Sequence, residues 1–188
     1  MDVYNETKIG KMVAWAGDHF IYEYGENEII KFSKFDFLMG KKNALAKFYN
    51  DYNLCKQYFG NYILDTEICY SKNRRRIAKI QRRLTGHLLT LKDLDDEYIR
   101  SQLREILQSY DRMAQSKLPF IDLIGQKGVW KKCIGNIFVT ADKKLVIFDA
   151  TLFKVSEFRV WQRPIIFLLL QLGRQIQKYR LKQFRLSI

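Results

Sequence analysis

Two polar side chains in the last third of the sequence have types and a spacing that suit a divalent cation. Asn136 precedes the apolar run Ile137–Thr140, and Asp149 follows a second run, Lys144–Phe148. The pattern predicts a hairpin in which Asn136 opens the first short strand and Asp149 ends the second. An amide oxygen and a carboxylate held close together suit a Mg²⁺ ion that carries a nucleotide phosphate.

A lysine near the start of the sequence has a related pattern. Lys31 ends a short apolar strand, and the helix predicted after it carries Asp51. A lysine on a strand can bind the phosphates of a nucleotide when a carboxylate on a helix orients it. Glu67 competes as the partner of Lys31, and a solvated surface position is the alternative for each charge. For Asn136 and Asp149 the alternative is a turn or a helix cap.

The periodicity of apolar residues predicts the elements that position these side chains. Alternation from Met12 to Phe32 indicates three antiparallel strands, the last of which ends at Lys31. Helical spacing follows over Gly40–Tyr58. Two more strands are predicted over Tyr62–Tyr70 and Arg76–Leu84, joined by a basic turn.

The second half of the sequence is predicted to be mostly helical. Residues Thr85–His87 interrupt the last of the five strands, and Asp93–Ser116 combines an acidic first turn with an apolar stripe, which is typical of a long helix. Gly125–Gly135 is predicted as a loop rich in glycine and lysine. The residues from Phe158 onward are predicted as a basic helix.

Composition limits the class of protein. The chain has 188 residues, of which 47% are hydrophobic, which is enough for one domain with a core. Lysine and arginine outnumber acids by 33 to 20, and this net charge of +13 favours anionic partners. The three cysteines match neither a disulfide framework nor a zinc site, and no apolar run has the length of a spanning helix. We therefore expect a protein of the reducing cytosol.

The order of these parts resembles the protein kinase-like superfamily. A strand lysine (Lys31), a helix acid, two strands that lead to Gln81–Gly86, a long helix and the Asn136–Asp149 hairpin follow one another as they do in that family. Asn136 and Asp149 are 13 residues apart, the usual separation between the family's catalytic-loop asparagine and its metal-binding aspartate. The resemblance covers residues 12–153. It is greatest to small bacterial kinase-like proteins, such as the PhoP regulatory network family and the lipopolysaccharide-core sugar kinases.

The resemblance implies a single α+β domain over residues 1–188 with two lobes. Residues 1–86 would form a lobe with a five-stranded antiparallel sheet and one helix, and residues 87–188 a truncated, mostly helical lobe. ATP and Mg²⁺ would lie in the cleft between the lobes. The resemblance implies that Lys31 binds the α- and β-phosphates, that Asp51 orients Lys31, and that Asn136 and Asp149 bind Mg²⁺. It makes Asp122 the candidate catalytic base. The backbone around Gln81, Arg83 and Leu84 would receive adenine, and Gly17 would belong to a reduced glycine loop.

The sequence departs from the family pattern at the catalytic position. Kinases carry an aspartate five residues before the asparagine, and here that residue is Lys131. The nearest carboxylate is Asp122, which also fits a buried acceptor in a turn. Ala150 and Thr151 follow Asp149 in place of Phe-Gly. Two functions remain open: phosphate transfer to a small-molecule, sugar, lipid or protein hydroxyl, or regulatory binding by a catalytically inactive pseudokinase.

Two basic regions suggest further partners. Arg74–Arg76 lies on the predicted turn, and the segment Arg174–Ile188 intersperses basic with apolar residues. Solvated or core-packed positions are the ordinary explanation. An anionic substrate, an acidic partner or peripheral contact with an anionic membrane is the alternative. A nucleic-acid-binding module is a third hypothesis, although no RNA-recognition or helix-turn-helix signature supports it.

Overall fold

The computed structural model describes residues 3–15, 19–33, 41–70, 76–116, 120–149, 152–153 and 162–188. Gly17, the basic turn over 71–75 and the two residues after Asp149 lie outside these ranges. The chain forms two compact units. Unit 1 comprises Met1–Tyr52 and Asp65–Arg83, and unit 2 comprises Asn53–Leu64 and Leu84–Ile188. The fold class is α+β, as predicted.

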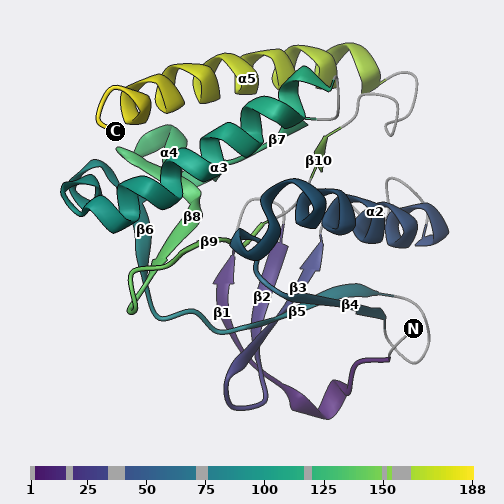
Figure 1. Cartoon of the computed structure of the whole chain (residues 1–188). Coiled ribbons are helices and arrows are strands. Elements are labelled where there is room, and N and C mark those ends of the chain that lie inside the picture. Colours follow the sequence, from purple (N-terminus) through teal and green to yellow (C-terminus); the bar gives the residue numbers. More distant parts are fainter. Residues whose placement is uncertain are drawn as a thin grey trace. The chain divides into compact units, whose positions relative to one another are not determined.

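Unit 1 contains a five-stranded antiparallel sheet (Figure 1), which confirms the sheet predicted from the sequence. The strand order is β1-β2-β3-β5-β4. The five strands are β1 (Ile9–Trp15), β2 (His19–Tyr24), β3 (Glu28–Ser33), β4 (Thr66–Tyr70) and β5 (Ile77–Arg82). Helix α2 (Lys41–Phe59) follows β3 in the sequence and precedes β4. Strand β3 continues to Ser33, beyond its predicted end at Lys31, because Phe32 and Ser33 still pair with β2.

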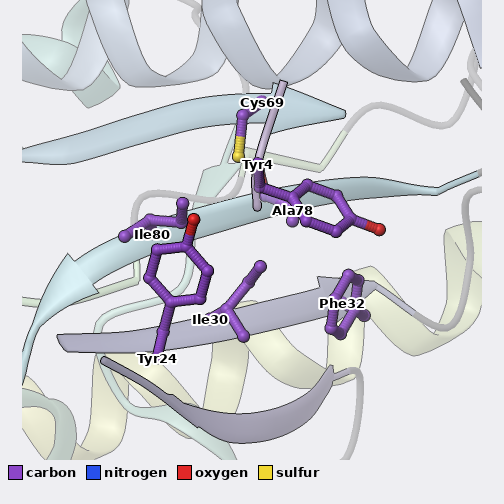
Figure 2. Packing of buried hydrophobic residues seen from close by; sticks show 7 residues of the cluster. All are labelled: Tyr4, Tyr24, Ile30, Phe32, Cys69, Ala78 and Ile80. Carbon is purple, nitrogen blue, oxygen red and sulfur yellow. Dashed lines mark hydrogen bonds between the residues drawn. The ribbon is translucent and has the colours of Figure 1, made fainter. Parts of the chain in front are cut away.

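The two faces of this sheet bury different residues. One face carries a hydrophobic cluster in which Ile30 and Ile80 pair directly across β3 and β5. Figure 2 shows the cluster, which consists of Tyr4, Tyr24, Ile30, Phe32, Cys69, Ala78 and Ile80. The opposite face packs against α2, where Ala44 and Phe48 contact Ile68 and Ile77. Because side chains alternate along a strand, residues 31 and 79 share the α2 face.

Among its described residues, unit 2 has the helices α3, α4 and α5, the end of α2 and two small sheets. The larger sheet has the order β6-β8-β9, and β7 pairs with β10. The elements are β6 (Gly86–Thr90), α3 (Glu97–Gln115), β7 (Phe120–Ile121), α4 (Gly125–Trp130), β8 (Cys133–Thr140), β9 (Leu145–Ile147), β10 (Leu152–Phe153) and α5 (Arg163–Arg185). The predicted helix over Asp93–Ser116 corresponds to a short 3₁₀ turn, Leu91–Asp95, followed by α3. Within the described ranges, no helix combines the length and the apolar character needed to cross a membrane.

Two predictions for this unit were wrong. The segment from Gly125 was expected to be a loop, but it begins with helix α4. Its glycines allow close backbone contact instead: a Cβ on Gly135 would lie 2.3 Å from the carbonyl oxygen of Ile124 and 2.8 Å from the amide nitrogen of Gly128. The second error is at Gly86, which begins strand β6. Only the residues before it were assigned to a strand.

Buried glutamines attach the helices of unit 2 to its strands. Gln102 of α3 accepts a hydrogen bond from the amide of Leu145 (3.0 Å) and donates one to the carbonyl of Lys143 (3.0 Å). Gln177 of α5 accepts from the amide of Leu123 (2.8 Å) and donates to the carbonyl of Ile121 (2.9 Å). Both side chains thereby satisfy backbone groups that strand pairing leaves over.

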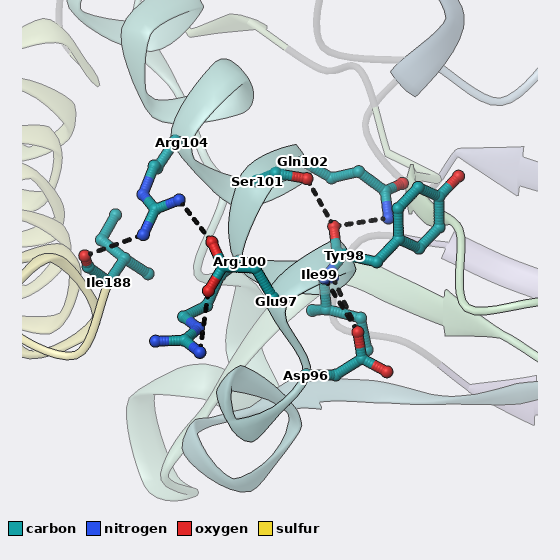
Figure 3. A network of polar contacts seen from close by, with 9 residues as sticks. All are labelled: Asp96, Glu97, Tyr98, Ile99, Arg100, Ser101, Gln102, Arg104 and Ile188. Atoms are coloured by element: carbon teal, nitrogen blue, oxygen red, sulfur yellow. Dashed lines mark hydrogen bonds and ion pairs between the residues drawn. The ribbon is translucent and has the colours of Figure 1, made fainter.

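Polar contacts join α3 to α5 and to the residues after it, and Figure 3 shows the one between Arg104 and Ile188. Arg104 of α3 pairs with Glu97 at 2.8 Å and donates to the backbone oxygen of Ile188 at 3.3 Å. Arg185 of α5 pairs with Asp111 of α3 at 2.7 Å. Asp96 caps the start of α3 by accepting from the amide of Tyr98 at 2.9 Å. The end of the chain is therefore fixed against α3.

Candidate functional site

Lys31 lies in the middle of the sheet of unit 1, on the face covered by α2. It is buried (6% exposed), and it pairs directly with Lys79 of β5, which is 8% exposed. Ile21 and Ile68 flank this pair on the neighbouring strands β2 and β4. The two lysines therefore stand side by side in an otherwise apolar row across the sheet.

Helix α2 adds further charges to this face. Asp51 accepts a hydrogen bond from the ammonium of Lys47 at 2.7 Å, and the two side chains are only 6% and 8% exposed. Phe48, on the same helix, lies under Lys79, whose ammonium is 4.8 Å from the ring centroid. The role predicted for Asp51, to orient Lys31, stays a prediction. The structure describes a contact of Asp51 with Lys47.

We define the lysine cluster as Lys31, Lys47, Lys79 and Asp51. These are the charged side chains that are buried among the described residues of unit 1. Sequence reasoning missed Lys47 and Lys79. The signals were present: Lys47 stands four residues before Asp51 on a helix, and Lys79 interrupts the apolar strand that pairs with that of Lys31.

The residues predicted to receive adenine lie at the end of β5. Gln81 is still within the strand, and its side chain donates to the hydroxyl of Thr66 at 2.7 Å. The backbone amide of Arg83 donates to the carbonyl of Asn27 at 2.7 Å. Leu84 is the first residue of the second segment of unit 2. The amide of Arg83 is thus used within unit 1.

In unit 2 the structure brings Asp122 and Asn136 together. The side-chain nitrogen of Asn136 donates to the backbone carbonyl of Asp122 at 2.8 Å. The backbone amide of Asn136 donates to the backbone carbonyl of Leu123 at 3.0 Å. Gly125 has a φ of +61°, and a Cβ there would lie 2.5 Å from the side-chain oxygen of Asn136. The asparagine oxygen is therefore held against a glycine that leaves room for it.

The carboxylate of Asp122 is a turn acceptor. Its Oδ1 accepts hydrogen bonds from the backbone amides of Ile124 and Gly125, both at 2.9 Å. This matches the alternative considered for Asp122 from the sequence. Lys131, at the position where kinases carry their catalytic aspartate, is exposed and follows the end of α4.

The sequence predicted that Asn136 opens a strand, and this prediction was wrong. Asn136 lies inside β8, which begins at Cys133 because Cys133 and Ile134 pair with β6, the strand that was missed. The hairpin itself is confirmed: β8 and β9 pair in antiparallel register from Ile137 with Ile147 onward. The amide of Phe148 donates to the carbonyl of Asn136 at 3.3 Å, so Asp149 follows a residue that is bonded to Asn136.

The tip of this hairpin is held by local charge. A hydrogen bond from Thr140, together with one from Lys144, lowers the pKa of Asp142 to about 2. The distance between Thr140 Oγ1 and Asp142 Oδ1 is 2.6 Å. Among the residues that the structure describes, no group of three or more histidine, cysteine, aspartate or glutamate side chains is arranged to hold a metal ion.

Comparison with known proteins gives similarity to solved structures. No protein-family model and no curated protein sequence matches the chain. The apo form of PpkA-294 is 14% identical with a TM-score of 0.48, over 79% of this chain and 60% of that one. The pseudokinase DRIK1 (drought responsive inactive kinase 1), bound to ENMD-2076, is 10% identical with a TM-score of 0.46, over 83% and 65%. The chain spans less than two thirds of each structure, and at this similarity no residue is assigned a role.

Proposed function

We propose that the chain is a kinase-like protein that binds ATP together with Mg²⁺. The observation that carries the proposal is the buried Lys31, which stands directly opposite Lys79 on the sheet. Two ammonium groups side by side on a sheet suit a bound polyanion, because a nearby opposite charge stabilises the charged form of a lysine. The triphosphate of a nucleotide is an anion of this kind.

The topology of unit 1 supports the same proposal. Its strand order is β1-β2-β3-β5-β4, and a helix is inserted between β3 and β4 in the sequence. The lysine is on β3 and the acid is on the inserted helix, as the resemblance to the kinase-like superfamily implies. In this proposal Lys31 contacts the phosphates. Asp51 neutralises Lys47 by forming an ion pair with it, and so lowers the net positive charge of the lysine cluster.

Unit 2 contributes the metal ligands in this proposal. Asn136 presents its side-chain oxygen while its amide nitrogen is held by Asp122, and Asp149 supplies a carboxylate one residue beyond Phe148. Oxygen ligands from an amide and a carboxylate suit Mg²⁺, which retains water and phosphate oxygens as its other ligands. A bound Mg²⁺ ion would neutralise part of the negative charge of the phosphates.

A second candidate function is regulatory binding without phosphate transfer. The observation that favours it is the carboxylate of Asp122, which accepts two backbone hydrogen bonds at 2.9 Å. Hydrogen bonds to a carboxylate stabilise its charged form and so weaken it as a proton acceptor. With Lys131 at the usual position of the acid, a pseudokinase is the alternative to an active phosphotransferase.

Thermal unfolding with and without Mg·ATP tests the proposal. We expect Mg·ATP to raise the melting temperature of the wild-type chain, because a ligand that binds only the folded state stabilises it. The shift should disappear in Lys31→Ala, fall to the size seen without Mg²⁺ in Asp149→Ala, and persist in the exposed control Lys11→Ala. A wild-type chain whose melting temperature ignores Mg·ATP would refute nucleotide binding.

ADP production then separates the two functions. Turnover that depends on Mg²⁺ and is lost in Asp122→Asn would identify an active enzyme and a catalytic aspartate. A wild-type chain that shows the thermal shift but produces no ADP, with or without added acceptors, would identify the pseudokinase.

A further inference from the structure

Helix α5 runs beside α3 within unit 2 (Figure 1). One of its faces carries buried side chains, and another is exposed. The packed face carries Gln177, Leu181 and Phe184, which are at most 2% exposed. Gln177 fixes this face to the backbone of Ile121 and Leu123. The orientation of the helix about its own axis is therefore determined within unit 2.

Five of the six exposed large apolar side chains of α5 lie on one face, and Phe167 is the sixth. We call these five the outer stripe: Ile165 (61% exposed), Leu168 (66%), Leu169 (58%), Leu172 (58%) and Tyr179 (63%). With 3.6 residues per turn, these side chains fall within an arc of about 100° that faces away from the packed residues. Scattered exposed apolar residues need no explanation, but a continuous stripe of this kind marks an interaction surface.

The charges of α5 indicate what kind of surface the outer stripe meets. The helix contains no acidic residue and six basic ones: Arg163, Arg174, Lys178, Arg180, Lys182 and Arg185. Arg185 is used in the ion pair with Asp111, whereas Lys178 and Lys182 are exposed on the side of the helix next to the outer stripe. An apolar stripe with lysines beside it is typical of a helix that lies in the headgroup layer of an anionic membrane.

We propose that the outer stripe of α5 binds the surface of an anionic lipid bilayer. Ile165, Leu168, Leu169 and Leu172 enter the boundary between headgroups and acyl chains, and Lys178 and Lys182 contact anionic headgroups. Tyr179 suits the same boundary because its ring is apolar and its hydroxyl is polar. The proposal is independent of nucleotide binding, which uses no residue of α5.

Vesicle flotation of the whole chain tests this proposal. We expect binding to phosphatidylcholine vesicles that contain about 30% phosphatidylserine, and little binding to pure phosphatidylcholine. The triple variant L168S/L169S/L172S should lose binding at least about tenfold, because each serine removes most of an apolar side chain that the bilayer would bury. The double variant K178E/K182E should lose at least about tenfold on anionic vesicles only.

Controls separate membrane binding from other occupants of the stripe. Q108S/Q115S changes two exposed positions of α3, away from the outer stripe and its lysines, and should bind as wild type does. The circular dichroism and the thermal unfolding of every variant report whether the fold is kept. Equal binding to neutral and anionic vesicles would overturn the proposal. So would absence of vesicle binding, including the case in which the wild-type chain self-associates through the stripe and the triple variant does not.

Discussion

The lysine cluster of unit 1 concentrates charge where a sheet normally buries apolar side chains. Lys31 and Lys79 are paired across strands, and Lys47 and Asp51 form an ion pair whose atoms are 2.7 Å apart. Taking charged side chains out of water costs on the order of several kcal/mol per ion before their attraction to partners is counted. Three lysines and one acid on this face also leave an excess of positive charge, and this excess is the physical argument for an anionic ligand there.

Gly125 gives a residue-level test of the Asn136 geometry. We predict that Gly125→Ala lowers the free energy of unfolding by more than the about 1–2 kcal/mol expected for a left-handed φ alone, because the new Cβ would meet the side-chain oxygen of Asn136 at 2.5 Å. Denaturant unfolding measures this change. We also expect the Mg²⁺-dependent part of the ATP response to weaken.

Gly60→Ala is the matched control for this variant. Gly60 has a similar φ of +55°, but a Cβ there would meet nothing within 4 Å. The difference between the two variants therefore isolates the contact with Asn136. Equal losses of stability would mean that the contact relaxes without cost and that Gly125 does not position the asparagine.

Among the contacts of helix α3, the side chain of Gln102 attaches it to the β8–β9 hairpin. Gln102 satisfies the amide of Leu145 and the carbonyl of Lys143 on this hairpin. We predict that Gln102→Leu lowers the free energy of unfolding by about 2 kcal/mol or more, because it leaves the buried amide of Leu145 and the carbonyl of Lys143 without this partner. Gln108→Leu, at an exposed position of the same helix, should change it little. Urea unfolding of both variants decides; equal effects would contradict the attachment.

The turn before α3 makes stability depend on pH. Burial by itself raises the pKa of Asp93, but hydrogen bonds from His87 and Thr90 outweigh it, so the pKa lies below its usual value. The amide of Thr90 donates to Asp93 at 2.7 Å. A carboxylate whose pKa is lowered on folding stabilises the folded state fully above its ordinary pKa of about 4, and this contribution is lost as the pH falls through the lower folded pKa.

Asp93→Asn tests this dependence. We expect the variant to be less stable than wild type at neutral pH and the difference to shrink below about pH 4, measured by urea unfolding across that range. Asp95→Asn, an exposed change on the same turn, serves as the control. A difference between Asp93→Asn and wild type that stays constant with pH would show that the carboxylate charge is not what stabilises the turn.

At the scale of the whole molecule, the parts that the sequence predicted are those with strong local periodicity. The five strands of unit 1, helix α2 and the α3 stripe all repeat apolar residues at a regular spacing. Strand β6 was missed because Gly86 and His87 indicate a turn, yet pairing with β8 extends them. Helix α4 was missed because its glycines suggest a loop, whereas close contact with β8 requires them.

The candidate site was predicted less completely than the fold. Asn136 and Lys31 were identified by type and spacing, but the position of Asn136 inside β8 depends on a strand partner distant in sequence. Lys79 enters the site only through the register of β3 with β5, which the pattern of a single strand does not contain. Cross-strand register and helix contacts are features of tertiary structure. The spacing of residues along one segment therefore does not predict them.

The net charge of +13 is divided over the molecule. Part of it lies in the lysine cluster of unit 1, and part on α5, which has six basic residues and no acid. These two concentrations of charge suit different anions, a nucleotide and a lipid surface, so each is tested separately. Loss of ATP binding without loss of vesicle binding, and the reverse, should both be obtainable by mutation.

Titration calorimetry of ATP with the whole chain, with and without Mg²⁺, tests the central claim most directly. We predict saturable binding that is strengthened by Mg²⁺, abolished by Lys31→Ala, reduced to its Mg²⁺-independent level by Asp149→Ala, and unchanged in the exposed variant Lys11→Ala. Absence of binding by the wild-type chain, or binding that Lys31→Ala leaves intact, would contradict the account.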